Sequence, residues 1–283
     1  RALCLSLSGV DCEADAERWE ALARGWFPGV RVRCCNDAVA ALAAGTGGDL
    51  RGAALVAGTG TVALGFAEPR EGTGGSGDGE AAAGSPAAPF DFGGREWRSA
   101  RAAGWGGVFL DGGSGFDLGQ RALASAARAL DGRHPERRGE RLVAAVLEAV
   151  GARDAEGLLA WAYDPAGGGG AGAWAPIAAL APVVDQLAAE GDEAALDIMG
   201  TAGAELYTSL HSVIRRLGLG ADGRAFPVVL AGGLMRKGRP LGTAVARHLA
   251  EACPLAEAVF PDAEPAQGAA LLARQLLRIS DED

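Results

Sequence analysis

The stretch Gly58-Thr59-Gly60 separates two apolar runs, residues 53–57 and 61–67, and could hold a ligand against the backbone. Two glycines would let a phosphate group approach backbone amides closely, and the threonine adds a hydroxyl, so the stretch could form an anion nest. A bare hairpin turn explains the same residues. Taken alone, the stretch favours the hairpin.

Asp37 is a carboxylate at a boundary, where the apolar run 30–35 has ended and an alanine-rich helix is predicted to begin. Aspartate is a good helix N-cap, and in that role it stabilises a helix by roughly 1 kcal/mol. Side chains at the carboxyl ends of strands also project into the ligand crevice of α/β sheets, where Asp37 could act as a general base. Its position alone favours the cap.

A second carboxylate, Asp111, follows Trp105 by six residues and precedes a glycine-rich turn. Trp105 stands between Gly104 and Gly106, whose backbones a ligand could approach closely. A carboxylate beside an indole and open amides suits a sugar, because hydroxyl groups bind the carboxylate and the apolar ring face packs on tryptophan. A turn capped by Asp or Ser explains Asp111 equally well.

The pair Gly232-Gly233 follows the apolar run 226–231, which is predicted to be a buried strand, and precedes a helix. It is either a simple strand-to-helix turn or a surface against which an adenine ring or ribose packs. The sequence has no G-x-x-x-x-G-K-[ST] pattern and no Rossmann G-x-G-x-x-G with an acidic partner at the proper distance. The two commonest nucleotide-binding folds are therefore not supported.

Composition narrows the classes of partner. The chain has 283 residues, a formal net charge of −10 and 49% hydrophobic residues, enough for one large domain or two lobes. The acidic balance argues against binding to duplex nucleic acid, which needs clustered Lys and Arg. No apolar run reaches the roughly 20 residues that span a membrane, and no signal peptide is visible, so we expect a cytoplasmic protein.

Metal-ligating residues are few and scattered. Only three histidines occur, far apart in the sequence, and the five cysteines at 4, 12, 34, 35 and 253 lack the paired spacing of metal sites. We therefore expect neither a zinc site nor a Ser-His-Asp triad, and we expect the cysteines to be reduced core thiols of an intracellular protein.

Strand and helix patterns alternate along the chain, which predicts an α/β fold. Residues 68–95 are rich in Gly, Ala, Pro and acidic side chains and hold too little apolar material to fold, so we expect a disordered insertion. The expected strands are 2–8, 30–35, 53–57, 61–67, 226–231 and 257–260. The expected helices are 13–25, 36–44, 116–130, 136–150, 154–163, 176–190, 192–217, 238–252 and 265–278.

Several of these stretches occur in one characteristic order. They are Ser6-Leu7-Ser8-Gly9, Asn36-Asp37-Ala38, Ala57-Gly58-Thr59-Gly60-Thr61, Gly104-Trp105-Gly106, Asp111-x-Gly-Ser114-Gly, Val229-Leu230-Ala231-Gly232-Gly233 and a closing segment from Pro265 to Leu272. The series resembles the N-acetylglucosamine kinases of the BadF/BadG/BcrA/BcrD-type ATPase family, in the actin–hexokinase–Hsp70 superfamily. The resemblance spans nearly the whole chain apart from 68–95. It implies a two-lobed actin-like (ribonuclease H-like) α/β fold whose first lobe is incomplete here.

The resemblance also implies an ATP-dependent kinase that uses Mg²⁺ and phosphorylates the 6-hydroxyl group of N-acetylglucosamine. Asp37 matches the aspartate that contacts the sugar and acts as the base. The remaining matches are Gly58, Thr59 and Gly60 to a phosphate-binding loop, Gly104, Trp105, Gly106 and Asp111 to the amino-sugar site, Gly232 and Gly233 to the adenosine motif, and Ala178 to a helix beside the nucleotide. Glucosamine and N-acetylmannosamine stay open as substrates, and so does a homodimer.

The resemblance predicts how the chain is divided. Residues 1–47 would be the remnant of a first lobe, completed by the helix 265–278, and residues 50–264 would form the second lobe. The family's first phosphate loop, of the D/E-G-G-G-T type, and a sugar-contacting asparagine would lie upstream of Arg1. We therefore predict that these 283 residues alone are inactive or very weak.

Two other functions stay open. Family members usually read Gly-Asp-Glu-Gly-Ser where this chain has Leu110-Asp111-Gly112-Gly113-Ser114. The lost acidic side chain would suit a non-catalytic sugar-binding or regulatory relative. An ATPase that activates 2-hydroxyacyl-CoA dehydratases shares the fold, but it holds an iron–sulfur cluster between subunits, for which the cysteines here are poorly placed.

Overall fold

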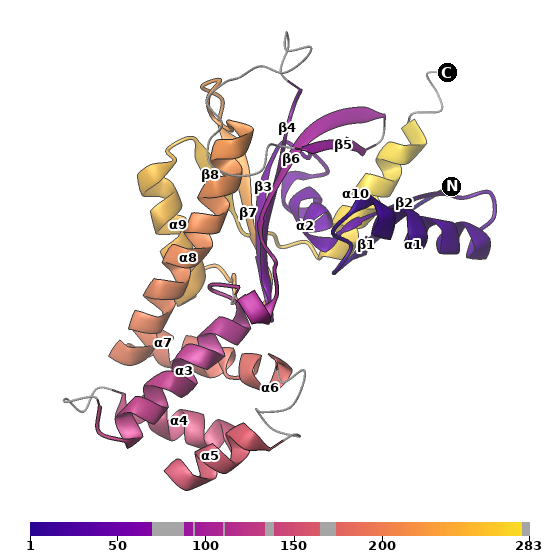
Figure 1. Cartoon of the computed structure of the whole chain (residues 1–283). Coiled ribbons are helices and arrows are strands. Elements are labelled where there is room, and N and C mark those ends of the chain that lie inside the picture. The colour runs from indigo at the N-terminus through magenta and orange to yellow at the C-terminus, as the bar shows by residue number, and fades with distance from the viewer. Residues whose placement is uncertain (70–87, 93, 110, 134–138, 165–173, 279–283) are drawn as a thin grey trace.

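The structure is a computed structural model of the chain (Figure 1). It describes residues 1–69, 88–92, 94–109, 111–133, 139–164 and 174–278. Within these residues the strands form two sheets, one of two strands and one of six. The α/β class expected from the sequence is confirmed.

The first 47 residues form a small layer in which each strand is followed by a helix. Its elements are β1 (Ala2–Leu7), α1 (Glu13–Trp26), β2 (Arg31–Asn36) and α2 (Asp37–Thr46). The two strands are parallel, with Leu7 opposite Asn36, and α1 packs on β2. Asn36 and Asp37 therefore lie at the carboxyl edge of the two-stranded sheet.

The six-stranded sheet has the order β5-β6-β4-β3-β7-β8 in the described part of the chain. Its strands are β3 (Gly52–Ala57), β4 (Thr61–Ala67), β5 (Ala88–Phe92), β6 (Arg95–Ala103), β7 (Phe226–Ala231) and β8 (Ala256–Val259). β3, β7 and β8 are parallel, and Val56 of β3 is opposite Ala231 of β7. The loops after β3 and β7 therefore leave the sheet at the same edge.

Helices cover both faces of the six-stranded sheet (Figure 1). α8 (Glu193–Leu217) and α9 (Pro240–Ala252) pack on one face, and α2 and α10 (Pro265–Arg278) lie on the other. Leu55 and Leu230 are buried in the first core, whereas Phe66 and Val229 are buried in the second. The remaining helices are α3 (Gly115–Leu130), α4 (Glu140–Val150), α5 (Ala155–Tyr163), α6 (Trp174–Ala178) and α7 (Ala181–Ala189), with a short 3-10 turn at Gly107–Phe109.

Small residues let α2 lie very close to both α10 and β7. A Cβ atom added to Gly268 of α10 would be 2.0 Å from the carbonyl oxygen of Ala40, and one added to Gly45 of α2 would be 2.5 Å from Val229 Cγ2. Both positions therefore require glycine for packing. The contact brings the C-terminal helix onto the first 47 residues, where it also packs against β1.

The structure differs from the sequence patterns in two places. β5 and β6 form where no strand is predicted, because Phe92 and Trp97 are buried in the core beside α2. The expected insertion therefore stops short of residue 95, while residues 70–87 lie outside the described residues. The single helix expected at 176–190 is two helices, because Pro182 favours a new helix start at Ala181.

Candidate active site

The carboxyl end of β2 presents two adjacent polar side chains, Asn36 and Asp37. Asn36 is the N-cap of α2, and its side-chain oxygen accepts a hydrogen bond from the Ala38 amide at 2.9 Å. Asp37 is the first residue of the helix, so the cap role favoured for it on position alone is wrong. The N-cap side chain of α2 is therefore that of Asn36 and not that of Asp37.

The half-buried Asp37 carboxylate has an altered proton affinity. Burial raises its pKa above the usual value, and the negative charge of Asp11 adds to the rise. Backbone amides at Asp37 and Ala38 oppose the effect by hydrogen bonding to the carboxylate. The net direction is upward, which makes Asp37 a stronger base than an exposed aspartate.

The two glycine-containing loops predicted to bind a nucleotide lie together at the ends of β3 and β7. Gly232 has φ +101° and packs so closely that an added Cβ would be 2.3 Å from the carbonyl oxygen of Ala57. At Gly58 and Gly233, in contrast, an added Cβ would meet no described atom within 4 Å. Gly232 therefore lets the two loops pack together, and Gly58 and Gly233 leave open space over the backbone.

Helix α3 holds the Gly58-Thr59-Gly60 turn in place. The amide of Gly115, the first residue of α3, donates to Gly58 O at 2.7 Å, and the amide of Phe116 donates to Thr59 O at 3.2 Å. Ala178, at the end of α6, lies beside Gly115, since a Cβ added to Gly115 would be 3.5 Å from Ala178 O. Ala178 therefore lies in the same cluster as the Gly58-Thr59-Gly60 turn.

Asp111 organises the loop that carries Trp105. Its side-chain oxygens accept hydrogen bonds from the amides of Trp105 at 2.8 Å and Gly106 at 3.0 Å, and the side chain is 6% exposed. A Cβ added to Gly60 would be 3.5 Å from Asp111 Oδ2, so the carboxylate also lies beside the turn after β3. The Trp105 side chain is 75% exposed. Asp111 thus joins the predicted sugar and phosphate loops.

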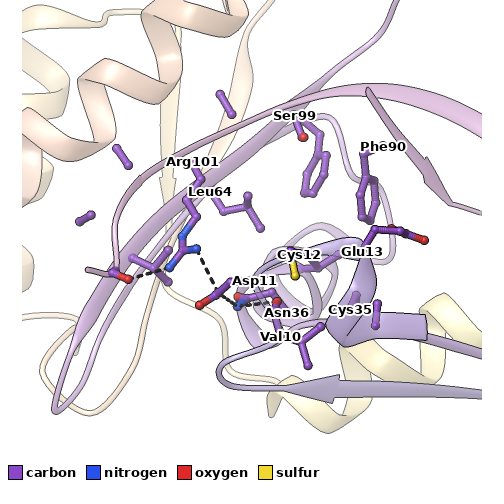
Figure 2. A pocket seen from close by; sticks show the side chains of 18 of the residues that line it. Val10, Asp11, Cys12, Glu13, Cys35, Asn36, Leu64, Phe90, Ser99 and Arg101 are labelled. Atoms are coloured by element: carbon purple, nitrogen blue, oxygen red, sulfur yellow. Dashed lines mark hydrogen bonds and ion pairs between the residues drawn. The ribbon is translucent and has the colours of Figure 1, made fainter. Parts of the chain in front are cut away.

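A cavity of about 710 Å³ lies between the two sheets (Figure 2). Gly104 and Trp105, in the loop after β6, line one wall, and Asp11 and Asn36, beyond β1 and at the end of β2, line the other. An ion pair of 3.2 Å between Arg101 Nη1 and Asp11 Oδ1 crosses it. The cavity therefore has walls from both halves of the molecule.

Asp37 is not part of that cavity. It opens onto a groove of about 660 Å³ between β1 and α10. Gly232 and Gly233 line a third hollow of about 540 Å³, which Arg236 and Lys237 also border. The structure thus brings the predicted nucleotide and sugar loops together, whereas Asp37 is connected to the cavity between the sheets only through its neighbour Asn36.

Asp11 and Arg101 are site residues that sequence reasoning missed. Asp11 follows the turn after β1, and Arg101 lies in β6, a strand that the patterns did not predict. A single arginine in an unrecognised strand carries no local signal. Only the packing of one sheet against the other brings these two side chains together.

Within the described ranges, no group of three or more His, Cys, Asp and Glu side chains is arranged to hold a metal ion. Mg²⁺ at phosphate sites is usually held by one or two carboxylates together with phosphates of the substrate. The residues present are therefore compatible with a cation that arrives with a nucleotide. In the same part of the chain, every helix is too short or too polar to cross a membrane.

Comparison with protein families gives one clear match. The model of the BadF/BadG/BcrA/BcrD ATPase family matches residues 91–273. This range contains Trp105, Asp111 and the pair Gly232-Gly233, whereas Asp37 and Thr59 lie before it.

Two relatives align with nearly the whole chain. An N-acetyl-D-glucosamine kinase of Dictyostelium discoideum is 32% identical over 277 residues, which cover 96% of this chain and 75% of that protein. An N-acetylmuramic acid/N-acetylglucosamine kinase of Clostridium acetobutylicum is 25% identical over 275 residues, which cover 96% of this chain and 77% of that protein.

Solved structures give the same fold. A protein of Chromobacterium violaceum proposed to be an N-acetylglucosamine kinase is 28% identical, with a TM-score of 0.61 over 96% of this chain and 75% of that one. A second such protein, from Porphyromonas gingivalis, is 19% identical, with a TM-score of 0.58 over 97% of this chain and 77% of that one. The latter supports the fold alone.

Proposed function

Because the chain belongs to the BadF/BadG/BcrA/BcrD ATPase family, we propose that it is a sugar kinase that transfers phosphate from ATP to the 6-hydroxyl group of N-acetylglucosamine. One observation carries the proposal: two glycine-containing loops with open backbones meet at the ends of β3 and β7, beside a loop that presents an exposed tryptophan. In α/β sheets, ligands bind at this edge.

The nucleotide would lie against the two glycine loops. Gly58-Thr59-Gly60 would receive the phosphate groups, because open backbone amides and one hydroxyl form an anion nest without a formal charge. Gly232 and Gly233 would receive the adenosine, with Ala178 nearby. Support comes from the open space over Gly58 and Gly233.

The sugar would lie on the loop Gly104-Trp105-Gly106. The exposed indole of Trp105 offers an apolar face for the sugar ring. Asp111 would accept hydrogen bonds from sugar hydroxyl groups. Each of its carboxylate oxygens accepts one hydrogen bond from a backbone amide and has room for another. Its bonds to the amides of Trp105 and Gly106 hold the carboxylate and the backbone that carries the indole in a fixed relation.

Phosphoryl transfer depends on position and charge more than on covalent help from the protein. We assign Asp37 as the base that accepts the proton of the sugar 6-hydroxyl. Its raised pKa and its freedom from the capping role support this assignment. In this structure Asp37 opens onto a groove separate from the cavity, so closure of the two halves on the substrates would bring its carboxylate to the hydroxyl group.

Mg²⁺ would enter with ATP and neutralise charge on the phosphates. The protein residues hold the glycine loops and the sugar, and they exclude water when the two halves close on the ligands.

Product identification tests the proposal. The protein, expressed from its complete gene, is given ATP, Mg²⁺ and one of N-acetylglucosamine, glucosamine or N-acetylmannosamine, and NMR locates the phosphate on each product. We expect the highest kcat/KM for N-acetylglucosamine, with phosphate on the 6-hydroxyl group. Phosphate on the anomeric hydroxyl group would overturn the role of Asp37, and a preference for glucosamine would overturn the proposed substrate.

A further inference from the structure

A chain of hydrogen bonds starts at the end of β2 and crosses the cavity between the sheets (Figure 2). Asn36 Nδ2 donates to Asp11 Oδ1 at 3.0 Å, and Arg101 Nη1 pairs with the same oxygen at 3.2 Å. One carboxylate oxygen of Asp11 therefore connects the cap of α2 with a side chain of β6.

The chain continues from Arg101 into the tryptophan loop. Arg101 Nη2 donates to Gly104 O at 2.8 Å. Gly104 has φ +75°, and an added Cβ would lie 2.4 Å from Arg101 Nη2, so the guanidinium packs directly against this glycine. The Arg101 carbonyl accepts a bond from Arg216 of α8, which fixes the backbone at the base of the side chain.

The geometry needs arginine in particular. Its two Nη atoms bind two different acceptors, one on each side of the cavity, and lysine with a single ammonium cannot reproduce that fork. The side chains of Arg101 and Asp11 are 33% and 39% exposed, and partly exposed ion pairs contribute little to stability. The pair is therefore better suited to fixing a distance than to holding the fold together.

We propose that Asp11 and Arg101 are positioning residues that set the tryptophan loop relative to Asn36 and Asp37. They would act on catalysis through the loop at Gly104 and through the cap at Asn36. This inference rests on the proposed sugar kinase function, because it couples the sugar loop to the proposed base.

The first test separates the sugar from the nucleotide. Asp11→Asn keeps an oxygen for Asn36 but removes the charge that pairs with Arg101, and Arg101→Lys keeps the charge but removes the fork. In each variant we expect the KM for the sugar to rise about tenfold, while the KM for ATP changes less than about twofold. The double variant should raise the KM for the sugar no further than the single variant with the larger effect, because both substitutions break the same connection.

A matched control comes from an ion pair far from the cavity. Glu190→Gln breaks the pair between Glu190 and Arg141, which are also far apart in sequence and partly exposed. Both KM values should stay as in the unmodified enzyme. An equal rise in the KM for the sugar in this variant would show that the loss of any ion pair has this effect, and it would overturn the inference.

The second test does not depend on activity. Hydrogen exchange measured by mass spectrometry on residues 103–109 should speed up in Asp11→Asn and stay unchanged in Glu190→Gln. Unchanged loop exchange in both Asp11→Asn and Arg101→Lys would overturn the coupling. Faster loop exchange, in a protein that phosphorylates no amino sugar, would support the coupling and refute the proposed function alone.

Discussion

Asn36 and Asp37 are neighbours in the chain, but the fold gives them different roles. Asn36 caps α2, so the Asp37 carboxylate is not required at the helix terminus. A half-buried carboxylate with a raised pKa costs stability, and such groups are concentrated at functional sites. At the scale of single residues, Asp37 is therefore the side chain to test first.

Asp37→Asn should reduce kcat by about 10²- to 10⁴-fold while sugar affinity is retained, because the amide fills the space but accepts no proton. The melting temperature at neutral pH should rise, since a desolvated charge is removed. Enzyme assay, calorimetry and thermal unfolding measure the three quantities. Asp49→Asn, at an exposed aspartate after the same helix, should change none of them. Unchanged turnover in Asp37→Asn would exclude the base role.

The pH dependence follows from the direction of the Asp37 pKa shift. A raised folded-state pKa means that the folded protein keeps this proton where the unfolded chain has lost it. Its contribution to stability is therefore largest below the ordinary aspartate pKa of 3.8 and is lost as pH rises through the folded-state pKa. Activity should increase as pH rises, because Asp37 must be ionised to act as a base. We expect kcat/KM for the sugar, which reports the free enzyme, to fall on acidification with a midpoint above 3.8, and a midpoint at or below this value would contradict the assignment.

At the scale of elements, β3 and β7 bring their loops together, but the two glycines after β7 are not equivalent. Gly232 packs on the backbone of Ala57 with a positive φ, whereas Gly233 faces open space. The first glycine is required by the fold and the second by the proposed nucleotide. Substitution can separate these two requirements.

Gly232→Ala should lower the free energy of unfolding by about 2 kcal/mol or more, through backbone strain and the clash with Ala57. Gly233→Ala should change it by less than about 0.5 kcal/mol but raise the KM for ATP, because the methyl group occupies the proposed nucleotide space. Urea titration and initial rates measure the two effects. If Gly233→Ala leaves the KM for ATP unchanged, the nucleotide does not pack on this loop.

At the scale of the whole molecule, α10 ties the end of the chain to its first 47 residues. The glycine at 268 permits the close approach to Ala40. Gly268→Ala should lower the free energy of unfolding by about 1–3 kcal/mol, because α10 must move away from α2. Gly200→Ala, on an exposed part of α8 where an added Cβ meets no described atom within 4 Å, should instead stabilise the protein slightly. Equal melting temperatures for the two variants would contradict the packing described.

The elements that could be predicted are those whose pattern is local. α1, α8 and α10 follow apolar spacing within a residue or two of their observed bounds, and β7 lies where its apolar run predicts. β5 and β6 could not be predicted, because their burial depends on the side of the sheet that α2 covers. Pro182 is a local signal for the break between α6 and α7, because proline favours the first turn of a helix.

The candidate site was predicted only in part, for the same reason. The glycine loops carry a pattern in the chain itself, and the comparisons confirm the family to which that pattern points. Asp11 and Arg101 carry none, because their pairing depends on how two sheets face each other. The roles of Asp37, Thr59 and Trp105, the division into lobes at 47 and 264, and the weak activity expected of these 283 residues stay predictions.

The most direct test of the kinase assignment is the dependence of ADP formation on the sugar. The protein, expressed from its complete gene, is mixed with ATP and Mg²⁺, and ADP is measured with and without N-acetylglucosamine beside the sugar phosphate formed. We predict that ADP appears only with the sugar and in equal amount to the sugar phosphate. ADP release that is independent of the sugar, or sugar binding without any ADP, would contradict the account.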